Sequence, residues 1–536
     1  MKKNIYDAFF SDLIHLFPSI NDNLNLKEYS HLNHLLENSH SEEHKNRQKT
    51  LFKNYIKKIL QNKQLNIYDK TLLNMCRNSL RSFNYDFELF PITHQENLVI
   101  SIMELSAEHS IISFSKKSDY QNVVKKLENL ECITNTIILN MNKGIEKKMT
   151  LPKIIAVKLL DQFISFKKNK SYKNNNIKLK LDFDFNNIVE KLILPSLNKM
   201  IDFLKNKYVK NCRNSIGLCG LKNGESMYKF IVKNTTSLNS ITIESIHNYG
   251  LREIKRIHKE MMDIKEQHNF KGTLKEFSKH LKKLDRYKFK NKSDVIKTYQ
   301  NEILFINNNI INKLFYKKVK NIDCKVKPVP SYNEEFSAEA YYIPGDLDNK
   351  RKGTFYVNMR NIKENNKLEV ESLTLHEANP GHHYQLTYVN ESKSIPMFLK
   401  IDGSEAYMEG WALYCESLGE YKNNESYFGK LILEMIRALR LVVDTGIHYY
   451  NWDYNKTFNY YKKFSFDSDN QIHTQILRYI SIPGQALSYK IGEKVIFDLY
   501  KKESKKLNFN IKKFHEKILE NGAVPLFLLK EKFSNK

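Results

Sequence analysis

Apolar side chains recur every three or four residues along most of the first 320 positions, which is the spacing of an amphipathic helix. One such stripe consists of Leu251, Ile254, Ile257, Met261 and Ile264. Between about residues 321 and 360 the pattern changes to short runs of β-branched and aromatic residues bounded by turn residues, as in Tyr341–Pro344 and Gly353–Asn358. Helical periodicity then returns and continues to Lys536. The sequence therefore predicts a mainly helical protein with a small β-element, which we expect to be antiparallel.

Length, composition and charge narrow the class of protein. The 536 residues can bury a large core, and 41% hydrophobic with 27% charged residues is a globular composition, not a disordered or collagen-like one. Lys and Arg number 86 against 60 Asp and Glu, so the net charge is +26, which can attract polyanions. Because the lysines are scattered, a solvated basic surface is favoured and a nucleic-acid partner is not expected.

Two further features bear on the compartment. The six cysteines lack paired spacing, which excludes a disulfide framework or a zinc knuckle. No stretch approaches the roughly 18–20 apolar residues that span a bilayer. The first residues carry two lysines, but Asp7 and Asp12 interrupt any apolar signal segment, and Phe9, Leu13 and Leu16 have helical spacing. We expect a cytoplasmic protein without a transmembrane segment.

The chemistry concentrates near residues 375–385, which read LHEANPGHHYQ. His376-Glu377 resembles the start of the H-E-x-x-H zinc signature, in which two histidines one helical turn apart hold the ion and the glutamate activates water. The next histidine, His382, comes six positions later. On an unbroken helix that is a rise of about 9 Å and a rotation of about 120°, so the two could not share one ion.

Pro380 and Gly381 change this expectation, since proline disrupts the helical hydrogen bonds and glycine frees the backbone. The distortion can return either His382 or His383 toward the first histidine, and we favour His382. In the alternative interpretation one helix ends at Asn379 and another begins at Pro380, so that the histidines are ordinary cap residues.

A third metal ligand would be a carboxylate on a neighbouring helix. The segment 405–420 carries four glutamates on one helical stripe, Glu405, Glu409, Glu416 and Glu420. A solvated acidic face would also explain them. Gly410, in the middle of this helix, indicates the close approach of another element, because glycine there costs about 1 kcal/mol.

Two more segments place polar residues together. A helix over 431–448 carries one polar face, made of Arg437, Arg440, Asp444 and His448. A surface stripe of salt bridges would account for that face. After Pro483-Gly484, Gln485 and Tyr489 are spaced one turn apart, which core or cap roles would equally explain.

Together these segments resemble DUF885, a family of bacterial proteins regarded as zinc peptidases of the gluzincin-like superfamily. The resemblance rests on residues 353–358, 376–382, 409–414, 440–448, 478–479 and 483–492. It implies a helical metallopeptidase-like fold with a deep cleft and the β-element beside the metal. We expect residues 1–320 to form one wall of this cleft and residues 321–536 to form the catalytic region, both within one continuous domain.

The resemblance also implies one Zn²⁺ per chain, with His376, His382 and Glu409 as ligands and Glu377 as general base. His383 is the alternative second ligand. The implied reaction is hydrolysis of peptide bonds, of a carboxypeptidase or oligopeptidase kind.

Four kinds of substrate contact follow from such a mechanism. We expect His448 and Tyr489 to donate to the developing oxyanion. Arg478, or less favourably Arg440, would pair with the terminal carboxylate of the substrate. The strand at 353–358 would pair with an extended peptide by edge addition, and Asn358 would contact that peptide. Gln485 would bind the substrate beside the Tyr489 phenol.

Two other functions fit the same residues. A metal-dependent hydrolase of a non-peptide amide or ester would use an identical centre. A non-catalytic, basic polyanion-binding or scaffold protein would be marked by the loss of a ligand or base, and neither ligands nor base are missing from this sequence.

Overall fold

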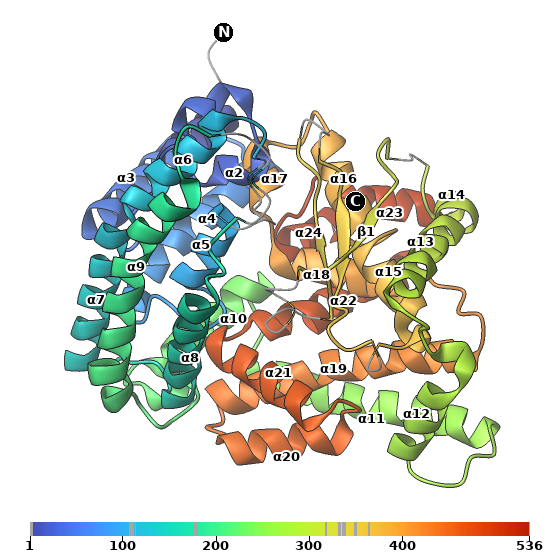
Figure 1. The fold of residues 1–536 in the computed structure, drawn as a ribbon. Coiled ribbons are helices and arrows are strands. Elements are labelled where there is room, and N and C mark those ends of the chain that lie inside the picture. The colour runs from blue at the N-terminus through green and yellow to red at the C-terminus, as the bar shows by residue number, and fades with distance from the viewer. Residues whose placement is uncertain are drawn as a thin grey trace. The chain divides into compact units, whose positions relative to one another are not determined.

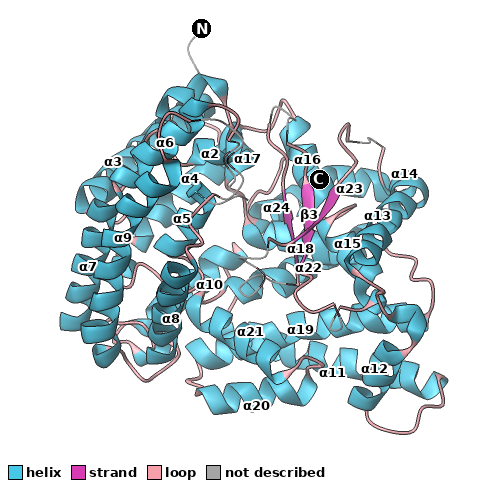
Figure 2. Ribbon diagram, viewed as in Figure 1, coloured by secondary structure: helices cyan, strands magenta, loops and turns pink. Residues whose placement is uncertain are grey.

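The structure is a computed structural model that describes residues 4–106, 112, 114–174, 177, 181–316, 319–330, 334, 339–347, 351–362 and 365–534. Helices dominate it and one small sheet interrupts them (Figure 2), so the prediction of a mainly helical protein is confirmed. The chain forms two compact units. Unit 1 contains residues up to Met227 with the short segments Asn451–Asp453 and Ile480–Ile482, and unit 2 contains the rest.

Unit 1 is entirely helical in its described residues. Its helices are α1 (Ile5–Leu16), α2 (Ile20–Leu24), α3 (Glu42–Ile59), α4 (Ile67–Ser82), α5 (Leu98–Ser106), α6 (Lys117–Glu128), α7 (Leu130–Glu146), α8 (Lys153–Asn169) and α9 (Phe185–Phe203). α3 packs on α4, and α9 packs on α7 and α6. The predicted first helix is present as α1: Asn4 caps its N-terminus, and Phe9 and Ile14 are fully buried.

Unit 2 carries the sheet and the remaining helices. These are α10 (Gly224–Thr236), α11 (Ile243–Gln267), α12 (Leu274–Lys283), α13 (Lys292–Asn309), α14 (Ile311–Leu314), β1 (Lys325–Pro328), β2 (Ala340–Ile343), β3 (Thr354–Val357), α15 (Val370–Glu377), α16 (His382–Glu391), α17 (Met397–Ile401), α18 (Glu405–Glu416), α19 (Asn424–His448), α20 (Tyr454–Phe464), α21 (Asp469–Ser481), α22 (Ser488–Glu503), α23 (Ile511–Leu519) and α24 (Leu526–Ser534). The first residues of α10 belong to unit 1.

Two long helix pairs form the framework of unit 2. α11 runs beside α19 (Figure 1), and α18 crosses α22. α11 begins at its cap Thr242, and its predicted apolar stripe is buried at Ile254, Ile257 and Met261. α19 differs from its prediction because nearly all of its residues are buried, including its polar ones. The expected surface stripe of salt bridges on this helix is therefore absent.

The three strands form one sheet in the order β1-β3-β2. β2 pairs with β3 in the expected antiparallel sense, with Tyr341 opposite Tyr356, but β1 pairs with β3 in parallel. The wholly antiparallel arrangement that we expected is thus corrected: the chain passes from β1 to the far edge before returning as the central strand. Phe355 of β3 is buried against Tyr299 of α13, with ring centroids 5.0 Å apart.

The main division between the two compact units falls at residue 227, so residues 228–320 group with the C-terminal residues. The intervening helices belong with the C-terminal residues, because α11 packs along α19 and α13 packs on α15 and β1. Among the described residues, no helix combines the length and the apolar character that crossing a membrane requires.

Candidate metal centre

A sharp reversal of the chain brings the two predicted histidines together. α15 ends at Glu377 and α16 begins at His382, so the motif is not one distorted helix but two helices joined by a short turn. A Cβ on Gly381 would lie 1.9 Å from the carbonyl oxygen of His376, so only glycine permits this close return. The helix break, which the alternative interpretation linked to ordinary cap residues, is therefore what places one histidine beside the other.

Hydrogen bonds to neighbouring elements hold this turn. Trp411 of α18 donates its indole N–H to the carbonyl oxygen of Pro380 at 2.9 Å. The Asn379 amide donates to Oδ1 of Asn307 on α13 at 2.7 Å and to the carbonyl oxygen of Ile322 at 2.9 Å. The position of the second histidine is thus fixed from both sides.

The third member of the site, Glu409, comes from α18, which is held very close to α22. A Cβ on Gly410 would lie 2.4 Å from Cα of Gly492, and one on Gly492 would lie 1.8 Å from the carbonyl oxygen of Ala406. The close approach predicted from the mid-helix glycine is confirmed. The two glycines let the backbones of α18 and α22 touch, and this contact fixes the position of Glu409.

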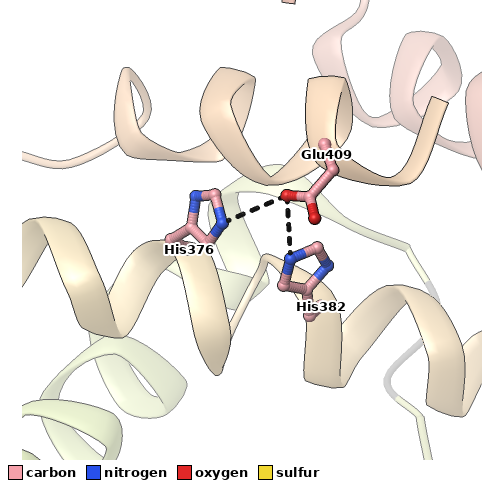
Figure 3. Close-up of side chains that lie close together, drawn as sticks. All are labelled: His376, His382 and Glu409. Carbon is pink, nitrogen blue, oxygen red and sulfur yellow. Dashed lines mark ion pairs between the residues drawn. The ribbon is translucent and has the colours of Figure 1, made fainter. Parts of the chain in front are cut away.

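His376, His382 and Glu409 form one cluster (Figure 3), in which both imidazoles point toward the carboxylate. Nε2 of His376 lies 3.6 Å from Oε2 of Glu409, and Nε2 of His382 lies 3.4 Å from the same oxygen. Donor atoms bound to a tetrahedral zinc at about 2.0–2.2 Å lie about 3.3–3.6 Å apart. Both separations from the carboxylate oxygen fall in this range.

The donor set itself also fits a cation. Two imidazole nitrogens and one carboxylate oxygen are the ligands that zinc prefers at sites with an open fourth position. Oε2 of Glu409 is buried and has no hydrogen-bond partner among the residues that the structure describes. A metal ion at this point would satisfy it.

The charges of the cluster are strongly coupled. Burial by itself would raise the pKa of Glu409, but the two facing imidazoles outweigh burial and hold it well below its usual range. Burial would lower the pKa of His376, but Glu409 and Glu416 outweigh burial and raise it to about 9. Metal binding requires a neutral imidazole, so it must release this proton.

Glu416, which no sequence argument assigned, orients the first histidine. Nδ1 of His376 lies 2.8 Å from Oε1 of Glu416, and Ser372 donates to the other oxygen at 2.8 Å. A carboxylate on the far nitrogen of a ligating histidine fixes which nitrogen faces the metal. The available signal was its position two turns after Glu409 on the predicted stripe. That stripe ends there, because α18 stops at Glu416 and Glu420 is exposed beyond it.

His383 lies outside the cluster. Its Nδ1 is 2.8 Å from the hydroxyl of Tyr342, and burial lowers its pKa to about 4. It lines a separate, small cavity. The choice left open between the two adjacent histidines is therefore resolved geometrically in favour of His382.

The cluster lies on the wall of a cavity of about 550 Å³ within unit 2. Six further residues predicted for the site line the same cavity: Glu377, Asn358, Arg440, Arg478, Gln485 and Tyr489. Glu377 is the last residue of α15 and directly follows the first histidine. Tyr489, at the start of α22, has its pKa raised by burial and by the charge of Glu409.

His448 does not line this cavity, and its expected role at the oxyanion is corrected. It is completely buried at the end of α19, where Nε2 donates to the carbonyl oxygen of Tyr479 at 2.9 Å. Its ring faces that of Tyr228, with centroids 5.3 Å apart. The spacing that placed it on the same helical face as Arg440 carries it two turns further along the helix, past the end of the cavity.

The strand at 353–358 is not free to pair with a substrate, because β3 is the central strand. β1 and β2 are the edge strands of the described sheet, and β2 is the one that lines the cavity, through Ala340, Tyr341 and Tyr342. The Asn358 amide donates to the carbonyl oxygen of Glu334 at 2.7 Å.

Comparison with known proteins places the chain in a family. Two solved structures share the fold over nearly the whole chain. One is described as a "putative lipoprotein" from Colwellia psychrerythraea; its TM-score is 0.86 at 21% identity, covering 99% of this chain and 97% of that one. The other, a "putative lipoprotein of unknown function" from Shewanella oneidensis, has a TM-score of 0.74 at 18% identity, covering 98% of each chain.

No curated protein is significantly similar to this chain. The sequence matches one family over residues 22–533, described as bacterial protein of unknown function. Because the match spans nearly the full length, the chain belongs to the DUF885 family.

Proposed function

We propose that this protein is a zinc-dependent hydrolase that cleaves peptide bonds. The observation that carries the proposal is the His376, His382 and Glu409 cluster, which opens into a cavity also lined by Glu377. These three side chains would hold the ion. When bound, zinc at such a site polarises a carbonyl oxygen and lowers the pKa of water toward 7.

The chain's own residues supply the remaining chemistry. Glu377, which lines the cavity, would accept the proton of the attacking water and deliver it to the leaving amine. Tyr489 is the remaining candidate to donate to the developing oxyanion, because its phenol lines the cavity and its pKa responds to the charge of Glu409. Glu416 keeps the His376 ring in the orientation that directs Nε2 to the cluster.

The edge strand β2 favours a peptide over another amide or ester. Its main chain pairs with β3 on one side only within the described sheet, and three of its residues line the cavity. An extended peptide can add to such an edge through main-chain hydrogen bonds. We also propose a cytoplasmic location, since the six cysteines are all free, as in reducing compartments.

The test is peptide hydrolysis by zinc-loaded protein in which Glu377 is replaced. Glu377→Gln should keep its zinc and lose about 10²- to 10⁴-fold in kcat, the usual contribution of a general base. Glu420→Gln is the matched control, because Glu420 is exposed and, among the described residues, forms an ion pair only with the exposed Lys313. Unchanged turnover in zinc-loaded Glu377→Gln would remove this residue as the base. Absence of hydrolysis in the wild-type protein across a peptide library would refute the peptidase.

A further inference from the structure

Two guanidinium groups in the cavity have no carboxylate partner. Arg440 of α19 and Arg478 of α21 both line it, and neither forms an ion pair with any described residue. Other arginines of unit 2 do so: Arg256 pairs with three glutamates and Arg286 with Glu425. The two cavity arginines therefore differ from the paired arginines in forming no direct ion pair with a described residue.

The burial of Arg440 makes its lack of an ion pair informative. Arg440 is only 8% exposed, yet its neighbours are phenols and not acids. Its Nε donates to the hydroxyl of Tyr479 at 3.4 Å, and its guanidinium carbon lies 4.4 Å from the ring centroid of Tyr489. Burying a cation without a counter-charge is costly. A site that bears this cost is prepared for an anion that comes from outside the chain.

Arg478 is held in place by a relay from the metal-binding helix. It donates to Oε1 of Gln485 at 3.1 Å, and the amide nitrogen of Gln485 donates to Glu405 at 2.6 Å. Glu405 thus fixes which end of the Gln485 amide faces the arginine. Because this relay uses an uncharged amide, it orients the guanidinium without neutralising it.

The relay also places the arginine near the metal cluster. Glu405 lies on α18 one turn before Glu409, which is about 6 Å along the helix axis. An anionic group bound at the arginines and a carbonyl held at the cluster would therefore lie in the same cavity.

We propose that Arg440 and Arg478 form a subsite for the free carboxylate at the C-terminus of the substrate, so that the enzyme is an exopeptidase that acts at the C-terminal end. This inference rests on the proposed peptidase function. Two planar guanidinium groups match the geometry of a carboxylate, which can accept parallel hydrogen bonds from each. Glu405 and Gln485 act as positioning residues.

The first test uses matched peptides that differ only at the C-terminus. A peptide with a free carboxylate should be cleaved about 10- to 100-fold more efficiently, in kcat/KM, than its C-terminal carboxamide, because the lost contacts are charge-assisted. A third peptide, a carboxamide ending in aspartate, identifies the source of the carboxylate. Equal cleavage of acid and amide, or full recovery with the aspartyl amide, would overturn a terminal-carboxylate subsite.

The second test measures binding without hydrolysis. In zinc-loaded protein carrying Glu377→Gln, adding Arg440→Gln or Arg478→Gln should weaken binding of the free-acid peptide about 10-fold or more and leave the carboxamide unaffected. Arg252→Gln is the control, since Arg252 is exposed on α11 and lies outside the cavity. If both arginine variants bind the acid as the parent does, the subsite is refuted. Because the readout is binding, failure of hydrolysis alone would count only against the peptidase.

The positioning role of Glu405 predicts a separate kinetic effect. Glu405→Gln frees the Gln485 amide to rotate, so KM for the free-acid peptide should rise several-fold while kcat and the carboxamide kinetics stay constant. An equal change for both peptides would show that Glu405 acts on the cluster as a whole and not on Arg478.

Discussion

α19 carries buried charged side chains on two sides, and the two sides differ in whether these charges form ion pairs. On one side lies a buried ion cluster, formed with α11 and α22 and consisting of Glu253, Arg256, Lys430, Glu434, Lys490 and Glu493. Three cations there face three acids, and every member has a partner. On the cavity side, Arg440 has phenols around it and no acid.

The difference separates charges that serve the fold from a charge kept for a ligand. Inside the buried ion cluster each charge is stabilised by the next, and Glu434 alone contacts Lys430, Lys490 and Arg256. Removing one member leaves the others uncompensated. Arg440 contacts phenols and forms no ion pair with a described acid, so removing it leaves no acid without its partner.

The largest expected effect comes from breaking the buried ion cluster at its centre. Glu434→Gln should lower the free energy of unfolding by about 3–5 kcal/mol, because two buried lysines and the partly exposed Arg256 lose their shared acid. Urea unfolding of unit 2, monitored by tryptophan fluorescence, measures the loss. The exposed substitution Arg252→Gln, also on the α11 side, should change it by less than about 0.5 kcal/mol. A loss below about 1 kcal/mol in Glu434→Gln would mean that the cluster does not stabilise the fold.

Lowering the pH should weaken the same buried ion cluster. Burial would raise the pKa of Glu434, but Lys490, Lys430 and Arg256 outweigh burial and hold it well below its usual range. The stability from this group is therefore complete above the unfolded glutamate pKa of about 4.3 and disappears as the pH falls toward the folded value. Wild-type stability should decline below about pH 4 more steeply than that of Glu434→Gln. Parallel pH profiles of the two proteins would contradict this assignment.

A smaller effect is expected where a charge serves the metal and not the fold. Glu416→Gln should weaken zinc affinity about 10- to 100-fold, as loss of a carboxylate behind a ligating histidine usually does. Competition with a chromogenic chelator measures it. Glu420→Gln, just beyond the same helix, should leave the affinity unchanged. Equal zinc affinity in both variants would show that Glu416 is only a core hydrogen-bond partner.

The smallest effect should come from the cavity side of the comparison. Arg440→Gln should change the free energy of unfolding by no more than about 1 kcal/mol, and an increase is as consistent as no change, because an unpaired buried charge is removed. The same urea unfolding experiment applies. A loss comparable to that of Glu434→Gln would mean that Arg440 has a structural counter-charge and would remove the contrast between the two regions.

Local patterns in the sequence predicted the elements that depend on near neighbours. The stripe of α11, the capped first helix and the β-runs all appear at or close to their expected positions, because each follows from spacing and turn residues alone. The close approach at Gly410 was equally legible, since a costly glycine needs a reason. The residues proposed as ligands are likewise together in space.

What could not be predicted depends on packing between distant segments. The central place of β3 follows from a β1 pairing that no local pattern specifies. His448 and Arg440 share one face of α19, yet only Arg440 reaches the cavity. Glu416 was indistinguishable from a solvated acid until α15 was placed beside α18. The unit boundary at residue 227 reflects the packing of α11 on α19 and not a linker in the sequence.

The most direct test of the account is the zinc content of purified protein, measured by elemental mass spectrometry on wild type, His382→Ala and His383→Ala. Of these adjacent histidines, His382 joins the cluster, whereas His383 hydrogen-bonds the hydroxyl of Tyr342 and lies outside the cluster. We predict about one zinc per chain in wild type and in His383→Ala, and its loss in His382→Ala. Equal zinc in the two variants, or none in wild type, would contradict a metal centre at His376, His382 and Glu409.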